Sequence, residues 1–288
     1  MKINGKTRMC AIIGDPVEHS LSPVMHNAAF KELGLNLVYA AFTVNARDLK
    51  TAILGAKSLG ILGLNITMPH KSAVVKYLDE LGEVTKSINA VNTIVNHQGK
   101  LIGYNTDGSG VMIALKENQV NPEKKKLVLL GAGGAAKAIA FQFGHEVKEL
   151  VILNRTLDKA KKLVEMLKNS KIKAKGRILS SNVLKEELST ADILINATSV
   201  GMSPDFSKSP VPSEFLRSDL DVMDIIYNPI KTKLIEDAEA VGAKIISGIE
   251  MLIYQGAVAF EIWTSCPAPI DVMKTAVLNQ IKKQRADS

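Results

Sequence analysis

The chain has 288 residues, of which 46% are hydrophobic and 23% charged, and no stretch approaches the ~20 uninterrupted apolar residues of a membrane span. The formal net charge of +7 could indicate a nucleic-acid partner, but aromatic residues make up only 5% and none is interleaved with the lysines, which argues against base stacking. The apolar run at the N-terminus is too short for a secretory signal, so we expect a cytoplasmic protein. Because single hydrophobic cores stop growing at about 250 to 300 residues, we expect two domains.

The two cysteines, Cys10 and Cys266, lie far apart in the sequence and form no Cys-x-x-Cys motif. This spacing favours reduced structural thiols, and we expect no metal site.

The first part of the chain alternates apolar runs with helical patterns. Strands are expected at 9–14, 37–44 and 60–66, and helices at 25–33, 47–59 and 72–81. Such alternation predicts βαβ units and a mainly parallel sheet, in which ligands lie beyond the carboxyl ends of the strands.

Two serines follow the first expected strand. Ser22 precedes Pro23, a pair that is typical of an N-cap and the first helical position, so capping alone could explain Ser22. Ser20 lies too early to cap the same helix, and we expect its hydroxyl to face a ligand.

Asn65, Thr67 and Lys71 place an amide, a hydroxyl and an ammonium at the end of the third expected strand. At the start of the helix expected over 72–81, a lysine would oppose the helix dipole. This local penalty favours a functional role for Lys71 over a merely structural one.

Two polar clusters come next, Asn89 to Thr93 and Asn105 to Gly108, with a hairpin turn expected between them at 97–100. Asp107 is a carboxylate among small polar residues at a strand end, which makes it a candidate site group. An aspartate that starts a helix can also be only a cap.

The stretch 126–140, KLVLLGAGGAAKAIA, is typical of a strand, a tight turn and a helix. Gly131 permits the turn, Gly133 lets the backbone approach a pyrophosphate, and the helix N-terminus supplies N–H groups and a positive dipole end. Ala136 occupies the third position of the G-x-G-x-x-G/A fingerprint. A dinucleotide is expected, although such a loop can also join a strand to a helix without a ligand.

The end of the next expected strand, 150–153, indicates which dinucleotide binds. NAD sites carry an acidic residue ~20 positions beyond the loop, whereas NADP needs that carboxylate absent and a cation present. Here the residues are Asn154, Arg155 and Thr156. Arg155 can bind a 2′-phosphate by charge-assisted hydrogen bonds, so NADP is the expected cofactor.

Further strands are expected at 194–197, 222–226 and 244–247, and helices at 250–264 and 270–283. Thr198 follows one of these strands, in the topological place that borders a nicotinamide. The two C-terminal helices are expected to pack back on the first domain.

With these motifs in place, the chain resembles the shikimate dehydrogenases, an NADP-dependent family of the shikimate (chorismate) route to aromatic amino acids. The matching motifs are Ser-x-Ser-Pro at 20–23, Asn-x-Thr-x-Pro-x-Lys at 65–71, Asn-Ala-x-Asn-Thr at 89–93, Asn-Thr-Asp-Gly at 105–108, the glycine loop at 131–136, Asn-Arg-Thr at 154–156, Asn-Ala-Thr at 196–198 and the segment 248–255.

The resemblance implies an α/β protein with a substrate-binding domain of residues 1–109 plus 255–288 and a Rossmann-type NADP-binding domain of residues 110–254. It implies reversible, NADPH-dependent reduction of 3-dehydroshikimate to shikimate, with Lys71 and Asp107 as the catalytic pair. The implied substrate-binding residues are Ser20, Ser22, Asn65, Thr67, Asn92, Tyr227 and Gln255. The implied cofactor-binding residues are Gly131, Ala132, Gly133, Gly134, Ala135, Asn154, Arg155, Thr156, Thr198 and Gly248.

Two alternatives remain open from the sequence. One is a quinate or shikimate dehydrogenase that uses NAD, which Asn154 and Arg155 argue against. The other is a non-catalytic NADP-binding sensor, which would have no need of Lys71 and Asp107. We expect a small-molecule substrate, no nucleic-acid or membrane partner, and a monomer or homodimer.

Overall fold

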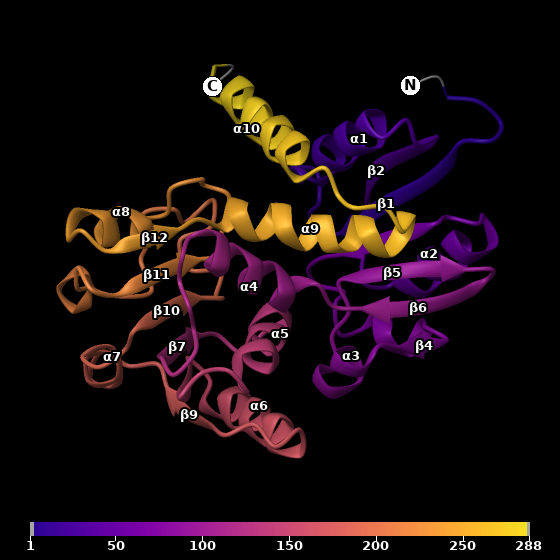
Figure 1. The fold of residues 1–288 in the computed structure, drawn as a ribbon. Helices are drawn as coiled ribbons and strands as arrows, with labels where there is room; N and C mark the ends of the chain where they lie inside the picture. Colours follow the sequence, from indigo (N-terminus) through magenta and orange to yellow (C-terminus); the bar gives the residue numbers. More distant parts are fainter. Residues whose placement is uncertain (1–2, 287–288) are drawn as a thin grey trace. The chain divides into compact units, whose positions relative to one another are not determined.

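A computed structural model describes residues 3–286 and divides the chain into two compact units, Met1–Thr106 with Ile253–Ser288, and Asp107–Leu252 (Figure 1). The sequence-based boundaries, after 109 and after 254, fall slightly later in the chain. The outermost residues of the first expected domain, 1–2 and 287–288, lie outside the described residues.

The first unit is built on a mixed six-stranded sheet with the order β2-β1-β3-β5-β6-β4. Its strands are β1 (Arg8–Gly14), β2 (Leu37–Thr43), β3 (Gly63–Ile66), β4 (Glu80–Leu81), β5 (Thr93–His97) and β6 (Lys100–Tyr104). β1 pairs in parallel with β2 and β3, as the βαβ pattern predicted. β3 pairs antiparallel with β5, and β5 and β6 form the hairpin expected at 97–100.

Helices cover both faces of this sheet. They are α1 (Ser22–Glu32), α2 (Leu49–Ser58), the 3-10 turn η1 (Val74–Tyr77), α3 (Glu83–Ile88), most of α9 (Gly248–Thr264) and α10 (Ile270–Ala286). α2 and η1 share one apolar core with β1 and β3. α10 packs against α1, which confirms that the C-terminal helices return to the first unit (Figure 1).

The helix expected over 72–81 is wrong. Its apolar residues have helical spacing, but the segment forms only η1 and then β4, which pairs with β6. Leu78 and Leu81 approach Gly103 of β6 so closely that a Cβ there would lie 2.5 Å from Leu78 Cδ1. Asp79 Oδ2 accepts the Leu101 N–H over 2.7 Å. These tertiary contacts outweigh the local helical preference.

The second unit contains a fully parallel sheet with the order β12-β11-β10-β7-β8-β9. Its strands are β7 (Lys126–Leu130), β8 (Glu149–Asn154), β9 (Ala174–Ile178), β10 (Ile193–Asn196), β11 (Asp221–Asp224) and β12 (Lys244–Ile246). Two runs of three strands diverge from the boundary between β7 and β10, which is the doubly wound order of a Rossmann fold. Ligands of such sheets bind at the carboxyl ends near this switch point.

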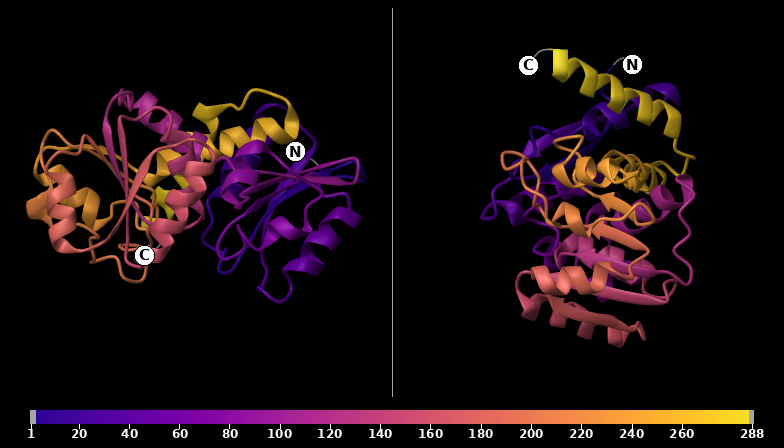
Figure 2. Two further views of the ribbon diagram at one scale, coloured as in Figure 1. Left: turned by 90° about the horizontal axis from the view of Figure 1, so that it is seen from below. Right: turned by 90° about the vertical axis from the view of Figure 1, so that its left-hand side faces the viewer.

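Helices lie on both faces of the parallel sheet, as the view from below shows (Figure 2, left). They are α4 (Asp107–Glu117), α5 (Gly134–Phe143), α6 (Leu157–Asn169), α7 (Ser181–Leu188) and α8 (Lys233–Ala240), with a 3-10 turn, η2 (Ser213–Phe215). α7 and α8 share one apolar core with β7, β8, β10 and β11, while α4 packs on α5. In the part of the chain that the structure describes, no helix combines the length and apolar character needed to cross a membrane.

Candidate active site

The carboxyl ends of β1 and β3 lie side by side at one edge of the first sheet. Ile13 of β1 pairs with Ile66 of β3, and the Thr67 N–H donates to Ile13 O over 3.0 Å. A Cβ added at Gly14 would lie 2.2 Å from the Thr67 side chain, so this close approach requires glycine. The polar segments that follow both strands therefore begin at the same edge.

Ser20 and Ser22 lie between β1 and the start of α1, and the structure corrects the expectation that Ser22 caps the helix. Ser22 is the first residue of α1, is buried, and does not cap the helix. Ser20 Oγ instead accepts the Ser22 N–H over 3.2 Å, so the earlier serine satisfies a backbone donor at the helix start. One turn further, Met25 lies where a Cβ on Gly256 would lie, which brings this end of α1 beside Gln255.

Asn65, in β3, has hydrogen bonds at both ends of its buried amide. Its Oδ1 accepts from the Tyr39 hydroxyl over 2.6 Å, and its Nδ2 donates to Asn92 O over 3.2 Å and to Thr93 Oγ1 over 3.3 Å. These bonds join β2, β3 and the start of β5. Asn65 therefore stabilises the strand ends from which the other polar residues project.

Asn92, Thr106 and Gln255 form a polar cluster. Asn92 Nδ2 donates to Thr106 Oγ1 over 2.9 Å and to Gln255 Oε1 over 3.4 Å, while the Thr106 N–H donates to Asn92 Oδ1 over 2.8 Å. Thr106 was not expected from the sequence, although it stands inside the polar motif at 105–108 that could have indicated it. Amides and a hydroxyl in this arrangement suit recognition of a hydroxylated substrate.

Lys71 follows β3 in a turn that leads to η1 and not to an α-helix. The dipole argument made from the sequence therefore does not apply. The backbone oxygen of Lys71 accepts the Val91 N–H over 2.7 Å, which brings Lys71 next to the segment that carries Asn92. Its neighbour His70 has a structural role, because Nε2 of the buried ring donates to Val44 O over 2.6 Å.

Asp107 and Tyr227 belong to the second unit. Asp107 is the first residue of α4, directly follows Thr106 in the chain, and is buried with 3% of its surface exposed. Tyr227 follows β11, and burial raises the pKa of its phenol. Tyr227 is therefore a neutral hydrogen-bonding group at physiological pH.

The glycine loop between β7 and α5 has the geometry that its sequence predicted. Gly131 has a φ of +111°, and a Cβ there would lie 2.7 Å from Ala197 O. A Cβ on Gly133 would meet open space, and no side chain of the described residues caps the N-terminus of α5. Ala136 is fully buried, which allows close packing of α5. The space beside Gly133 and the N–H groups of the first turn fit a pyrophosphate.

The other residues expected in this loop and first turn are in place there: Ala132, Gly134 and Ala135.

Asn154 ends β8 beside this loop, since the Gly131 N–H donates to Leu153 O over 2.8 Å. Asn154 Nδ2 donates to Thr156 O over 2.9 Å, which closes the turn before α6. Arg155 lies exposed in this turn and has no carboxylate partner among residues 3–286. An exposed guanidinium that no carboxylate neutralises fits the 2′-phosphate of NADP.

Thr198 starts the loop after β10 and lies beside the glycine loop, because its Cγ2 is 3.4 Å from the position of a Cβ on Gly131. Its N–H and its hydroxyl both donate to Asn196 Oδ1, over 3.0 and 2.7 Å. The structure thus brings Thr198 to the loop expected to hold the cofactor.

Gly248 starts α9, and a Cβ there would lie 2.3 Å from Ile226 O. This packing against the segment after β11 is a sufficient structural reason for glycine at this position.

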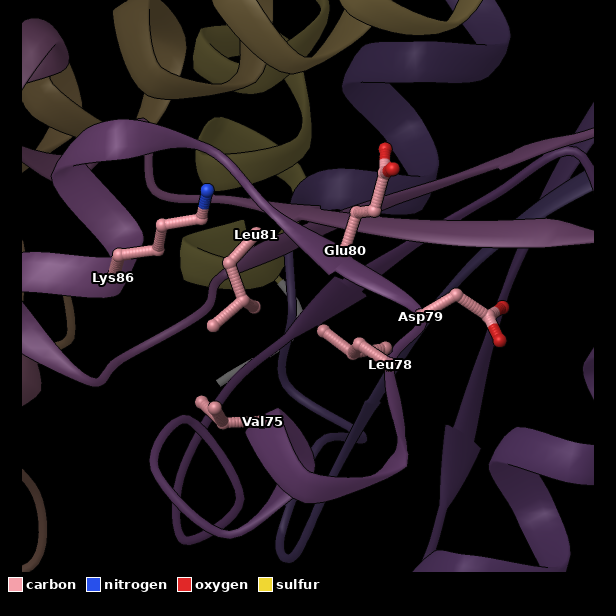
Figure 3. A pocket seen from close by; sticks show the side chains of 6 residues that line it. All are labelled: Val75, Leu78, Asp79, Glu80, Leu81 and Lys86. Atoms are coloured by element: carbon pink, nitrogen blue, oxygen red, sulfur yellow. The ribbon is translucent and has the colours of Figure 1, made fainter.

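A separate hollow of about 530 Å³ lies in the first unit and is lined by Val75, Leu78, Asp79, Glu80, Leu81 and Lys86 (Figure 3). None of these belongs to the expected site residues. Its carboxylates point away from the apolar side chains in Figure 3 and are engaged elsewhere, Asp79 with Lys57 over 2.7 Å and Glu80 with Lys100 over 2.5 Å. Within residues 3–286, no group of three or more His, Cys, Asp or Glu side chains could hold a metal ion.

Family models cover most of the chain. The shikimate dehydrogenase substrate binding domain matches residues 12–94, the shikimate / quinate 5-dehydrogenase model matches 113–209, and the shikimate 5′-dehydrogenase C-terminal domain matches 248–278. The chain belongs to the shikimate dehydrogenase family. A relative from Methanocaldococcus jannaschii named shikimate dehydrogenase (NADP(+)) is 49% identical over 282 residues, which cover 98% of this chain and 100% of the relative.

Solved structures of the shikimate dehydrogenase family share the fold throughout. A crystal structure of shikimate dehydrogenase in complex with NADP+ has a TM-score of 0.90 at 47% identity and covers 97% of this chain and 98% of its own. Quinate dehydrogenase from Corynebacterium glutamicum in complex with NAD has a TM-score of 0.87 at 31% identity, and covers 95% and 99%. The fold alone therefore does not separate the two cofactors, and the residues at the end of β8 must be considered.

Proposed function

We propose that the protein is an NADP-dependent shikimate dehydrogenase that reversibly reduces 3-dehydroshikimate to shikimate in the route to aromatic amino acids. The observation that carries the proposal is the setting of the polar cluster of Asn92, Thr106 and Gln255. Lys71 is bonded to the residue before Asn92, and Asp107 is the residue after Thr106. We propose that the Lys71 ammonium and the Asp107 carboxylate act on a polyhydroxylated substrate that this cluster binds.

The first unit would hold the substrate. We propose that Asn92, Gln255 and Thr67 bind its hydroxyls, and that Ser20, Ser22 and Tyr227 bind its carboxylate, with Asn65 in a mainly structural role. Support comes from the common edge that the segments after β1 and β3 share and from the contact between α1 and α9. Hydroxyl and amide groups can donate hydrogen bonds to the hydroxyls and to the carboxylate of the substrate without a buried countercharge.

Lys71 and Asp107 would handle the proton. NADPH, when bound, supplies a hydride to the carbonyl carbon of the substrate. The carbonyl oxygen then gains negative charge, and the Lys71 ammonium donates a proton from Nζ to this oxygen, which completes the alcohol. The Asp107 carboxylate orients the ammonium and the substrate hydroxyl. In the reverse direction, Lys71 accepts the hydroxyl proton while the hydride leaves the carbon.

The second unit would hold NADP. We propose that the glycine loop and the first turn of α5 bind the pyrophosphate, that Arg155 binds the 2′-phosphate with Asn154 and Thr156, and that Thr198 and Gly248 border the nicotinamide. Support comes from the open space beside Gly133 and the exposed Arg155.

The test is an oxidation assay in four combinations, shikimate or quinate with NADP+ or NAD+, that follows the absorbance of the reduced nicotinamide. We expect the highest kcat/KM with shikimate and NADP+. A higher value with quinate or with NAD+ would favour the NAD-dependent quinate alternative, for which the fold of the C. glutamicum enzyme gives a precedent. No turnover in any combination would contradict an enzymatic role.

We also propose a cytoplasmic location and a monomer or homodimer. The free thiols of Cys10 and Cys266 suit a reducing compartment. Light scattering coupled to size-exclusion chromatography measures the assembly state.

A further inference from the structure

Asp224, the last residue of β11, is a fully buried carboxylate that the proposed chemistry does not use. Its Oδ1 accepts from Asn196 Nδ2 and from the Ile226 N–H, both over 3.1 Å, and its Oδ2 accepts from the Thr232 hydroxyl over 2.7 Å. Burial raises the pKa of the carboxyl to about 6, and these bonds act in the opposite direction. A buried charge with only neutral partners is costly, so its presence calls for a reason.

The arrangement of Asn196 suggests that reason. An asparagine amide fits its space in two orientations that exchange the oxygen and the nitrogen. An ionised carboxylate only accepts hydrogen bonds, so it selects the orientation in which Nδ2 faces Asp224. Asn196 Oδ1 must then face the other way, and there it accepts both the N–H and the hydroxyl of Thr198. The reverse orientation would set the amide oxygen against the carboxylate and Nδ2 against the Thr198 N–H.

Thr198 also holds the next residues of the loop in place by a hydrogen bond. Its Oγ1 accepts the Val200 N–H over 3.2 Å, so the turn 198–200 is tied to Asn196. The same threonine lies beside the glycine loop at Gly131. The chain of contacts therefore runs from the buried end of β11 to the rim of the cofactor-binding loop.

We propose that Asp224 is a positioning residue for NADP binding: through the amide of Asn196 it holds the turn at Thr198 in the arrangement that receives the cofactor. This inference rests on the proposed function, because it takes Thr198 to border NADP. Asp224 itself is fully buried and would act only through Asn196.

Two substitutions separate the acceptor from the charge. Asp224→Ala removes the principal acceptor for Asn196 Nδ2 and leaves it only the Val200 oxygen at 3.5 Å, so the amide is held less firmly and we expect NADP+ to bind about tenfold more weakly. Asp224→Asn can keep an oxygen towards Asn196 and Ile226 while its amide nitrogen faces Thr232, whose hydroxyl can accept. This conservative variant should rescue NADP+ affinity to within about threefold of the wild type.

The matched control is Thr232→Val. It removes a bond to the same carboxylate and also the cap of α8, since Thr232 Oγ1 accepts the Ile235 N–H. We expect it to lower the stability of the protein while NADP+ affinity stays within about twofold, because loss of a cap affects folding and not the orientation of Asn196. A merely structural role for Asp224 would instead make affinity follow stability in all variants.

Isothermal titration of the full-length protein with NADP+ and urea denaturation measure the two quantities. Asp224→Val, which also lacks a side-chain acceptor, replaces the alanine variant if that does not fold. In a double-mutant cycle with Thr198→Val, the effect of Asp224→Ala should largely disappear, because both act through the same bonds. Unchanged affinity in the truncation, an equal loss in Thr232→Val or in Asp224→Asn, or additive losses in the cycle would overturn the inference. A wild-type protein that does not bind NADP+ would instead contradict the proposed function.

Discussion

A backbone hydrogen bond links Lys71 to a segment that is distant in the sequence. Its carbonyl oxygen is bonded to Val91, so the loop after β3 is fixed to the segment that carries Asn92. If the Lys71 ammonium donates a proton in the transition state, its removal should affect turnover more than substrate binding.

Lys71→Ala should lower kcat by about 10² to 10⁴, the range for loss of a general acid, with a smaller change in the KM for shikimate. Steady-state kinetics with shikimate and NADP+ measure both. Lys50→Ala, which removes an exposed lysine of α2, is the control and should behave like the wild type. Turnover near normal in Lys71→Ala would rule out the proposed proton transfer.

Asn154 and Arg155 carry the proposed preference for NADP. Asn154→Asp combined with Arg155→Ala should lower kcat/KM for NADP+ by about tenfold or more, because a charge-assisted contact is lost and a carboxylate faces the phosphate. The same change should improve the use of NAD+, since an acidic residue can accept from the ribose hydroxyl. Lys162→Ala on the exposed side of α6 is the control. An unchanged ratio of the two cofactors would place the 2′-phosphate elsewhere.

At the scale of elements, local signals in the sequence predicted β1, β2, the hairpin of β5 and β6, and the strand, turn and helix around Gly131, all of which the structure contains. These elements have short-range causes, such as an apolar run or a glycine with positive φ. The segment 72–81 was mispredicted because its fate depends on Gly103 and Leu101 of β6, which are distant in sequence. β9, α7 and α8 were not predicted at all.

Site residues in local sequence motifs were likewise predicted, and those that depend on distant parts of the fold were not. Residues in recognisable motifs, such as Asn92 and Gln255, were expected from the sequence, and the structure brings these two together. Asp224 was not expected, because a single aspartate within an apolar strand has no local signature. Its burial results from β10, β11 and the start of α8, which assemble only in the fold.

Gly63 shows how one glycine controls the packing of two elements. A Cβ there would lie 2.2 Å from Trp263 Nε1, the atom that donates to Ile94 O over 2.9 Å. The absence of a side chain in β3 thus lets the indole of α9 lie flush against the sheet. An added methyl group must displace either the ring or the strand.

Gly63→Ala should destabilise the protein by about 1 to 3 kcal/mol through overpacking. Gly55→Ala is the matched variant: Gly55 lies within α2 with open space around it, and alanine there should stabilise the helix by about 0.5 to 1 kcal/mol. Urea denaturation of both variants provides the free energies of unfolding. Equal effects in the two variants would show that the contact with Trp263 does not constrain β3.

At the scale of the whole molecule, stability should depend on pH through His26. Its imidazole is fully buried, its two nitrogens have no hydrogen-bond partner among the residues that the structure describes, and it stacks on Tyr39 with 4.5 Å between ring centroids. Burial lowers the pKa of His26 from 6.5 to about 3. Between these values the unfolded chain binds a proton that the folded chain does not, so the free energy of unfolding falls as the pH falls.

His26→Phe keeps the aromatic stack and removes this proton. From about pH 7.5 to about pH 5, the wild type should lose about 2 kcal/mol of stability relative to the variant. Asp224, whose folded pKa is raised, acts in the opposite direction between 3.8 and about 6, but it is present in both proteins and cancels in the difference. Urea denaturation at each pH measures the free energy of unfolding. Equal changes with pH in the wild type and in His26→Phe would contradict a buried neutral imidazole.

The most direct test of the proposed function is the stoichiometry of the reduction. The purified protein is mixed with 3-dehydroshikimate and NADPH, the loss of reduced nicotinamide is followed by absorbance, and shikimate is quantified by chromatography. The account predicts one shikimate formed for each NADPH oxidised. NADPH that is not consumed, or is consumed without formation of shikimate, would contradict it.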